Sequence, residues 1–145
     1  MAWPNKLKRA FLHWLGFDRY MYERVVLSVL AARQISNFAQ RAHPREFSAL
    51  IEGKVRNGTL ILSDVVYQHF EASDRAAVIH LNVPIGTDIR ATVHSHPSRN
   101  PLPSQADLRY FSKYAYVNFI VRYPYGPGDI HCYDGRGQPL SFSIR

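Results

Sequence analysis

The dipeptide His43-Pro44 divides the sequence into two parts that are expected to form different secondary structure. Proline restricts the residue before it to extended backbone and cannot continue a helical hydrogen-bond ladder, so a helix should end here. Before this point, apolar residues recur at helical spacing and predict one core helix over about residues 20–42. Along one side of this helix we expect Val26, Val29, Leu30, Arg33 and Asn37. Three further apolar residues, Val25, Ala32 and Ile35, are expected near that side.

The remainder of the chain is rich in strand patterns. Apolar or alternating runs bounded by turn residues predict strands at residues 47–53, 59–62, 76–81, 89–96, 116–123, 129–133 and 140–144. Asn57-Gly58 is typical of a hairpin turn, and Pro103-Ser104 opens a helix with an apolar stripe of Leu108, Phe111 and Ala115. The order of elements predicts the α/β class, with a single mixed β-sheet and helices packed against it.

Length and composition limit the class of protein. A chain of 145 residues with 46% apolar residues can bury a single core without disulfides. Cys132 is the single cysteine, so any metal must be held by nitrogen and oxygen, and a reducing cytoplasmic location is expected. The longest apolar stretch, residues 25–32, is far shorter than the ~20 residues of a spanning helix, so neither a membrane span nor an export signal is predicted.

Positive charge is concentrated at the start of the chain. Residues 1–45 carry 8 Lys+Arg against 2 Asp+Glu, and residues 46–145 carry 10 against 9, so the first segment holds +6 of the net +7. Residues 1–20 are expected to form a basic amphipathic N-terminal helix ahead of a domain over residues 21–145. General experience favours a helix whose apolar face packs on its own domain or on a sister subunit. The alternative is an arm that binds a membrane surface or a partner.

The segment that carries chemistry is His94-Ser95-His96-Pro97, followed by Ser104 and Asp107. Residues two apart in a strand share a face, so His94 and His96 can converge on one ion. Catalytic zinc usually takes three protein ligands and keeps a fourth position for water. Asp107 is brought back by a proline-rich turn and is the natural third ligand.

Each fragment also has an interpretation without a metal. Ser104 and Asp107 are spaced as a helix capping pair, and a lone His-x-His is tolerated on a half-exposed strand. Their combination, with a proline that ends the strand, favours the metal site. No role is assigned to the other candidates: His13, His43, His69, His80, His131, Glu52 and Cys132.

This combination resembles the signature of the JAMM or MPN+ zinc metallopeptidases, in which an upstream glutamate is followed by H-x-H, a short spacer and S-x-x-D. The segment from His43 to Gly53 is similar to the upstream element of that family, where a glutamate begins a buried strand that ends in glycine, and it selects Glu46 rather than Glu52. The resemblance runs from about Tyr22 to the carboxyl end, includes Tyr123-Pro124-Tyr125-Gly126, and is greatest with short stand-alone archaeal members. Residues 1–20 lie outside it.

The resemblance implies the JAMM/MPN architecture, which is cytidine-deaminase-like, and one Zn²⁺ per chain held by His94, His96 and Asp107. It implies Glu46 as the general base for zinc-bound water and Ser104 as a donor to the oxyanion, roles that suit a carboxylate and a hydroxyl. The implied activity is that of a deubiquitinase-like isopeptidase, which removes ubiquitin-like or sulfur-carrier-like modifiers from conjugated proteins.

Other functions remain open. A bacterial branch with the same motifs is associated with DNA repair, although the near-neutral residues 46–145 argue against it and no specific nucleic acid is expected as a partner. A non-catalytic MPN scaffold with a basic tethering helix is the other alternative, although such domains typically lose ligands that this chain retains. Residues 1–20 are expected to contact a second subunit or an anionic surface and to be dispensable for chemistry.

Overall fold

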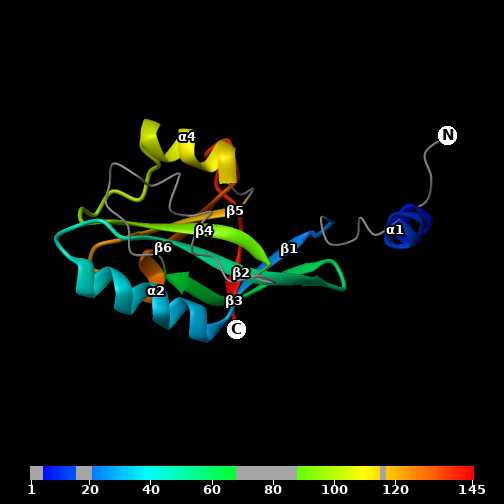
Figure 1. Ribbon diagram of the computed structural model, residues 1–145, viewed down its shortest axis with the longest axis horizontal. Helices are drawn as coiled ribbons and strands as arrows, with labels where there is room; N and C mark the ends of the chain where they lie inside the picture. Colours follow the sequence, from blue (N-terminus) through cyan, green and yellow to red (C-terminus); the bar gives the residue numbers. More distant parts are fainter. Residues whose placement is uncertain (1–4, 16–20, 68–87, 115–116) are drawn as a thin grey trace.

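The computed structural model describes residues 5–15, 21–67, 88–114 and 117–145, and its described strands form one mixed sheet (Figure 1). The sheet has seven strands in the order β6-β5-β4-β2-β3-β1-β7. Their bounds are β1 (Arg24–Leu27), β2 (Ser48–Arg56), β3 (Thr59–Tyr67), β4 (Ile89–His96), β5 (Val117–Arg122), β6 (Ile130–Tyr133) and β7 (Ser143–Ile144). β2 is antiparallel to both of its neighbours, whereas β5 is parallel to β4 and β1 is parallel to β3 and β7. The predicted fold class is confirmed.

Helices lie on both faces of this sheet. The described helices are α1 (Asn5–Trp14), α2 (Val29–Ala42), α4 (Gln105–Tyr114) and the short 3-10 helix η2 (Pro127–Asp129). In Figure 1, α2 covers one face, α4 covers the opposite face, and α1 lies apart from the sheet. Among the described residues, no helix is both long and apolar enough to cross a membrane.

The core is divided by the sheet. The larger part is on the α2 side, where Ala31, Ile35 and Ala39 pack with strand residues such as Val93 and Phe119. The smaller part is on the α4 side and contains Phe111, Ile120 and Tyr133. Because neighbouring strand residues point to opposite faces, β5 contributes to both parts, with Phe119 in the larger and Ile120 in the smaller.

The predicted single helix over residues 20–42 is wrong in its first third. Residues 24–27 form β1, which pairs with β3 on one side and β7 on the other, and α2 begins only at Val29. Ser28 separates the two elements because its Oγ accepts a hydrogen bond from the amide of Ala31 at 2.9 Å and donates one to the carbonyl of Ser63 at 2.7 Å. The predicted end is correct, since α2 stops at Ala42.

The side of α2 that faces the core also differs from the prediction. Its buried residues are Ala31, Ala32, Ile35 and Ala39. Val29 and Leu30, which were expected along the same side as Val26, are exposed. The sheet beneath the helix, rather than the largest apolar side chains, therefore decides which face is covered.

The predicted hairpin is confirmed. Asn57 and Gly58 both have positive φ values, of 49° and 71°, which is the backbone of the tight turn that suits the twist of two paired strands. β3 continues to Tyr67, beyond the predicted end at residue 62, and β7 is shorter than the predicted strand over 140–144. The predicted strand at 76–81 and the predicted helix residue Ala115 lie outside the described residues.

Candidate metal centre

The candidate site is formed where the carboxyl end of β4 meets the beginning of β2. In the antiparallel pairing of these strands, Ser48 is the partner of His94. The pairing continues one residue further, because the amide of Ser95 donates to the carbonyl of Phe47 at 2.9 Å and the amide of Phe47 donates to Ser95 Oγ at 2.7 Å. The same register places Glu46 next to His96. Because β2 begins at Ser48, Glu46 precedes the strand by two residues. This corrects the prediction that Glu46 begins the strand.

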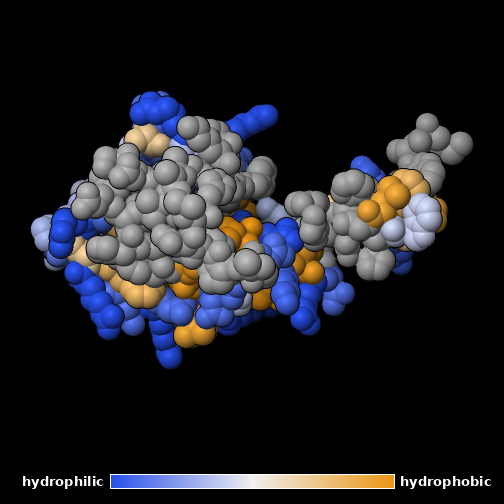
Figure 2. Space-filling view, viewed as in Figure 1, coloured by the Kyte–Doolittle hydropathy of each residue, from blue (hydrophilic) through white to orange (hydrophobic). Residues whose placement is uncertain are grey.

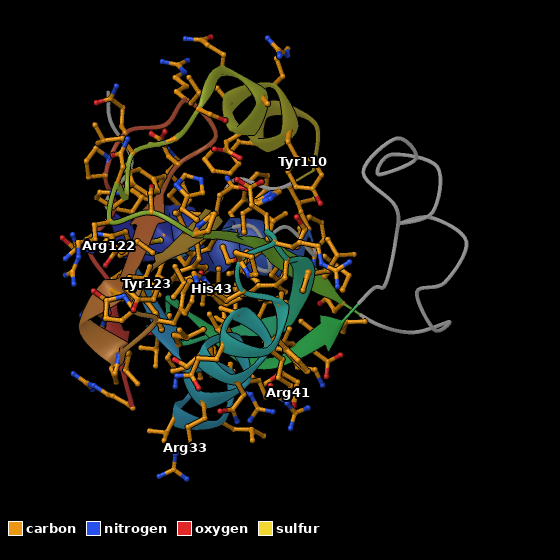
Figure 3. All side chains as sticks on the ribbon, turned by 90° about the vertical axis from the view of Figure 1, so that its left-hand side faces the viewer. Arg33, Arg41, His43, Tyr110, Arg122 and Tyr123 are labelled. Carbon is orange, nitrogen blue, oxygen red and sulfur yellow. The ribbon has the colours of Figure 1, made fainter. Side chains whose placement is uncertain are left out.

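His94 is held firmly on the α4 side of the sheet. Its side chain is buried, and its Nδ1 lies 2.8 Å from Ser48 Oγ. Its ring packs edge-on against Tyr110 of α4, with the centroids 4.6 Å apart, and lies near Phe111. Tyr110 is labelled on α4 in Figure 3. Strand β2 and helix α4 together determine where this imidazole points.

His96 is held by the loop that follows β4. Its Nδ1 lies 2.9 Å from the carbonyl oxygen of Asn100, and its Nε2 lies 3.2 Å from Asp107 Oδ2. A carbonyl oxygen only accepts hydrogen bonds, so Nδ1 must carry a proton and donate it. The proline-rich turn after β4 therefore fixes one nitrogen of this ring and aims the other at the start of α4.

Asp107 and Ser104 form the capping pair that their spacing allows. Asp107 Oδ2 accepts hydrogen bonds from the amide and the hydroxyl of Ser104, each at 2.7 Å, and the amide of Asp107 donates to Ser104 Oγ at 3.1 Å. Asp107 is buried, whereas Ser104 is exposed. The capping role is therefore present in the structure, and any role of Ser104 toward an oxyanion requires its hydroxyl to turn away from Asp107.

The His96–Asp107 contact shifts both groups toward their charged forms. The hydrogen bond to Asp107 raises the pKa of His96, against the opposing effect of burial, and the charge of Glu46 adds to the increase. Burial raises the pKa of Asp107, but the hydrogen bonds from His96 and Ser104 outweigh it and hold that pKa below its ordinary value. Asp107 is thus ionised near neutral pH.

The donor types and their spacing fit a zinc ion. With a proton already on Nδ1, a neutral His96 would direct the lone pair of Nε2 at an ionised carboxylate, so the contact needs a positive charge between the two atoms. Either a second proton or a metal ion supplies it. The 3.2 Å separation is close to the ~3.3 Å between two ligands of a tetrahedral zinc with bonds of ~2.0 Å.

Within the described ranges, however, no three His, Cys, Asp or Glu side chains are grouped as a metal site. His96 and Asp107 contact each other directly. The structure therefore brings together Glu46, His96, Ser104 and Asp107, and His94 lies on the same strand face as His96. The assignment of the zinc ligands stays a prediction.

Several residues around this centre have no signal in the sequence. Ser48 and Asn100, which contact the two imidazoles, carry no motif and are identified only by strand register and loop geometry. His43, which had no expected partner, contacts the hydroxyl of Tyr125 through Nδ1 at 2.8 Å. The ring of His43 also lies beside that of Tyr123, with centroids 5.2 Å apart (Figure 3).

The positions of Cys132 and Glu52 agree with the absence of a catalytic role for either residue. Cys132 is buried, and burial raises the pKa of its thiol to about 12, so it is not a nucleophile at neutral pH. Glu52 lies at the β-bulge of β2, six residues beyond Glu46 and away from the start of the strand.

Comparison with known proteins identifies the family. A model of the prokaryotic homologues of the JAB domain matches residues 29–133. The chain belongs to this family, and its predicted JAMM/MPN membership is confirmed.

Individual relatives agree with this result. A probable metalloprotease of Haloferax volcanii is 31% identical over 110 residues, which cover 70% of this chain and 68% of the relative. A JAB1/MPN domain protein from Archaeoglobus fulgidus has a solved structure with 30% identity and a TM-score of 0.66, covering 81% of this chain and 96% of that one. A structure described as JAMM, a metalloprotease-like zinc site in the proteasome and signalosome, shares 26% identity with a TM-score of 0.66, over 85% of this chain and 99% of its own.

Proposed function

We propose that this protein is a zinc-dependent metallopeptidase, and more narrowly an isopeptidase that removes ubiquitin-like or sulfur-carrier-like modifiers from conjugated proteins. The close approach of His96 Nε2 and Asp107 Oδ2 is the observation that supports this proposal most directly, because the two atoms lie at the spacing of two ligands of one tetrahedral zinc ion. His94, His96 and Asp107 would hold one zinc ion per chain. The metalloprotease relative and the JAMM zinc-site structure support the same chemistry.

A bound zinc ion supplies a Lewis acid that polarises the scissile carbonyl and lowers the pKa of water. Glu46 lies next to His96 and outside the packed core, where its carboxylate can take a proton from the attacking water and return it to the leaving amine. The hydroxyl of Ser104 is exposed and can turn from Asp107 to donate a hydrogen bond to the oxyanion. Ser48 and Asn100 keep the two imidazoles in place.

The modifier class rests on the resemblance to JAMM isopeptidases. The surface beside His96 offers contacts for an extended peptide tail. The amide of Tyr123 donates to the carbonyl of His96 at 3.0 Å, its side chain is exposed, and the guanidinium of Arg99 lies 5.8 Å from its ring centroid. A planar aromatic face and a cation are suited to peptide groups and to backbone carbonyls. This surface supports a peptide substrate without selecting one modifier.

The test combines metal content with cleavage of model conjugates. Purified protein should contain about one zinc per chain and release free modifier from ubiquitin-like and sulfur-carrier-like conjugates, and a chelator should stop the release. His96→Ala and Asp107→Asn should lose both zinc and cleavage, while Gln105→Ala, at an exposed position of the same helix turn, should keep both. Equal zinc in the wild type and His96→Ala after the same dialysis would overturn the metal assignment. Stoichiometric zinc without cleavage of any conjugate would overturn the proposed isopeptidase activity and favour the alternative of a non-catalytic MPN scaffold.

A further inference from the structure

Helix α1 presents large apolar side chains to solvent. Leu7, Phe11, Trp14 and Leu15 are 57%, 46%, 79% and 44% exposed. They lie within about one third of the helix circumference, because positions 7, 11, 14 and 15 repeat at helical spacing. In Figure 2, apolar atoms are visible on α1, at the right of the view. Solvent-exposed apolar patches of this kind generally mark a contact with something else.

The same helix is strongly basic. The first 17 residues contain Lys6, Lys8 and Arg9 and no aspartate or glutamate. Lys6 and Lys8 project from the two borders of the apolar face, at helical positions on either side of Leu7. A helix with aromatic and leucine residues on one side and lysines at its margins is suited to the boundary between acyl chains and headgroups.

The charge distribution argues against two other occupants of this apolar face. Residues 46–145 carry 10 Lys+Arg against 9 Asp+Glu, so the domain offers no net negative charge to a basic helix. A second copy of the chain would bring another +7. The favoured expectation is that α1 packs on its own domain or on a sister subunit, and the exposure of the four apolar side chains is contrary to the first of these.

We propose that α1 docks on an anionic lipid bilayer. The helix lies in the plane of the interface, with Leu7, Phe11 and Trp14 entering the acyl boundary and Lys6 and Lys8 at the level of the phosphates. At 10 residues it is too short to span the bilayer, which needs ~20. A nucleic acid would also attract the lysines, but it would leave the aromatic side of the helix in water.

Intrinsic fluorescence can follow this docking directly. Trp3 and Trp14 are the only tryptophans in the chain, and both belong to the first 14 residues. Full-length protein is titrated with vesicles of phosphatidylglycerol and phosphatidylcholine, and in parallel with vesicles of phosphatidylcholine alone. We expect a blue shift of the emission and co-sedimentation with the anionic vesicles, and much weaker binding to the neutral ones.

Paired variants separate the two components of binding. Leu7→Glu should abolish the shift, whereas Leu30→Glu, at an exposed apolar position of α2, should not change it. Lys6→Gln and Lys8→Gln should each weaken binding about fivefold, as expected for ~1 kcal/mol per basic residue near an anionic membrane. Lys54→Gln, an exposed lysine of β2, is the matched control.

Three results would overturn the proposal. One is an unchanged emission spectrum with anionic vesicles, and another is equal binding to neutral vesicles. The third is a blue shift in the absence of lipid. If that shift increased with protein concentration, a second copy of the chain would cover the apolar face of α1, and if it required duplex DNA, a nucleic acid would cover it. None of these outcomes depends on zinc or on cleavage, so the docking proposal can fail independently of the proposed function.

Discussion

At the scale of single residues, the two candidate zinc-binding imidazoles are each held through Nδ1 by an oxygen atom from another part of the chain. Ser48 Oγ holds His94, and the carbonyl of Asn100 holds His96. Such contacts set the tautomer of a metal-binding histidine and leave Nε2 to carry the lone pair. The Ser48 contact involves a side chain and can therefore be removed by substitution.

Ser48→Ala should weaken zinc binding by about tenfold to a hundredfold, the usual effect of removing such a supporting contact. The affinity is measured by competition with a chromogenic chelator. Thr92→Val is the matched control. Thr92 lies on the same strand as His94, two residues before it, and the substitution breaks its buried hydrogen bond to Asn118 of β5 without touching either imidazole. Equal zinc affinity in Ser48→Ala and the wild type would show that Ser48 does not position His94.

Glu46→Gln should retain zinc and the free energy of unfolding, because this side chain is exposed and precedes β2. It should reduce turnover at least about a hundredfold, the lower range expected for loss of a general base. Single-turnover cleavage and metal analysis of the same preparation check both parts. Glu52→Gln, in the middle of β2, is the control, and near-normal turnover of Glu46→Gln would remove the base role from this residue.

At the scale of elements, β2 is the strand on which the site depends, since it pairs with both β3 and β4. Its pairing shifts around Glu52 and Gly53, where a β-bulge interrupts the register on both sides. A Cβ atom at Gly53 would lie 2.5 Å from the carbonyl oxygen of Ile61, so only glycine allows the backbones to approach this closely. The irregularity lies in the middle of β2, and the pairing of Ser48 with His94 at the start of the strand is regular.

Gly53→Ala should therefore lower the free energy of unfolding by about 1–3 kcal/mol, the usual cost of forcing extra atoms into a packed core. Urea denaturation followed by circular dichroism measures the change. Gly128→Ala in η2 is the matched control, because a Cβ atom there meets nothing within 4 Å. If both variants were equally stable, the close approach at Gly53 would not constrain the sheet.

At the scale of the whole molecule, the family match over residues 29–133 contains every candidate site residue, and α1 lies outside it. Deletion of residues 1–20 should leave zinc content and cleavage of a small conjugate almost unchanged. It should remove co-sedimentation with anionic vesicles, because it removes both tryptophans and the basic apolar helix. A folded truncation with stoichiometric zinc but no activity would make the N-terminal segment part of the catalytic unit.

The elements that the sequence predicted well are those whose signal is local. The hairpin at Asn57-Gly58 depends on two neighbouring residues with positive φ, and β4 matches its predicted bounds because residues 89–96 are a β-rich run stopped by a proline. Ser104 and Asp107 lie close together because they are three positions apart at the start of a helix. Spacing alone determines such contacts.

Tertiary structure decided what the local pattern left ambiguous. Residues 24–27 fit a helical and an extended pattern equally, and only pairing with β3 and β7 makes them a strand. The contacts of Ser48 with His94 and of His43 with Tyr125 join residues 46 and 82 positions apart, so no short motif can announce them. The sequence by itself determined which residues are candidates for the chemistry, since their types and spacing are local properties. The fold alone determined how the imidazoles are oriented and that α1 stays exposed, because both depend on which surfaces the sheet leaves to be covered.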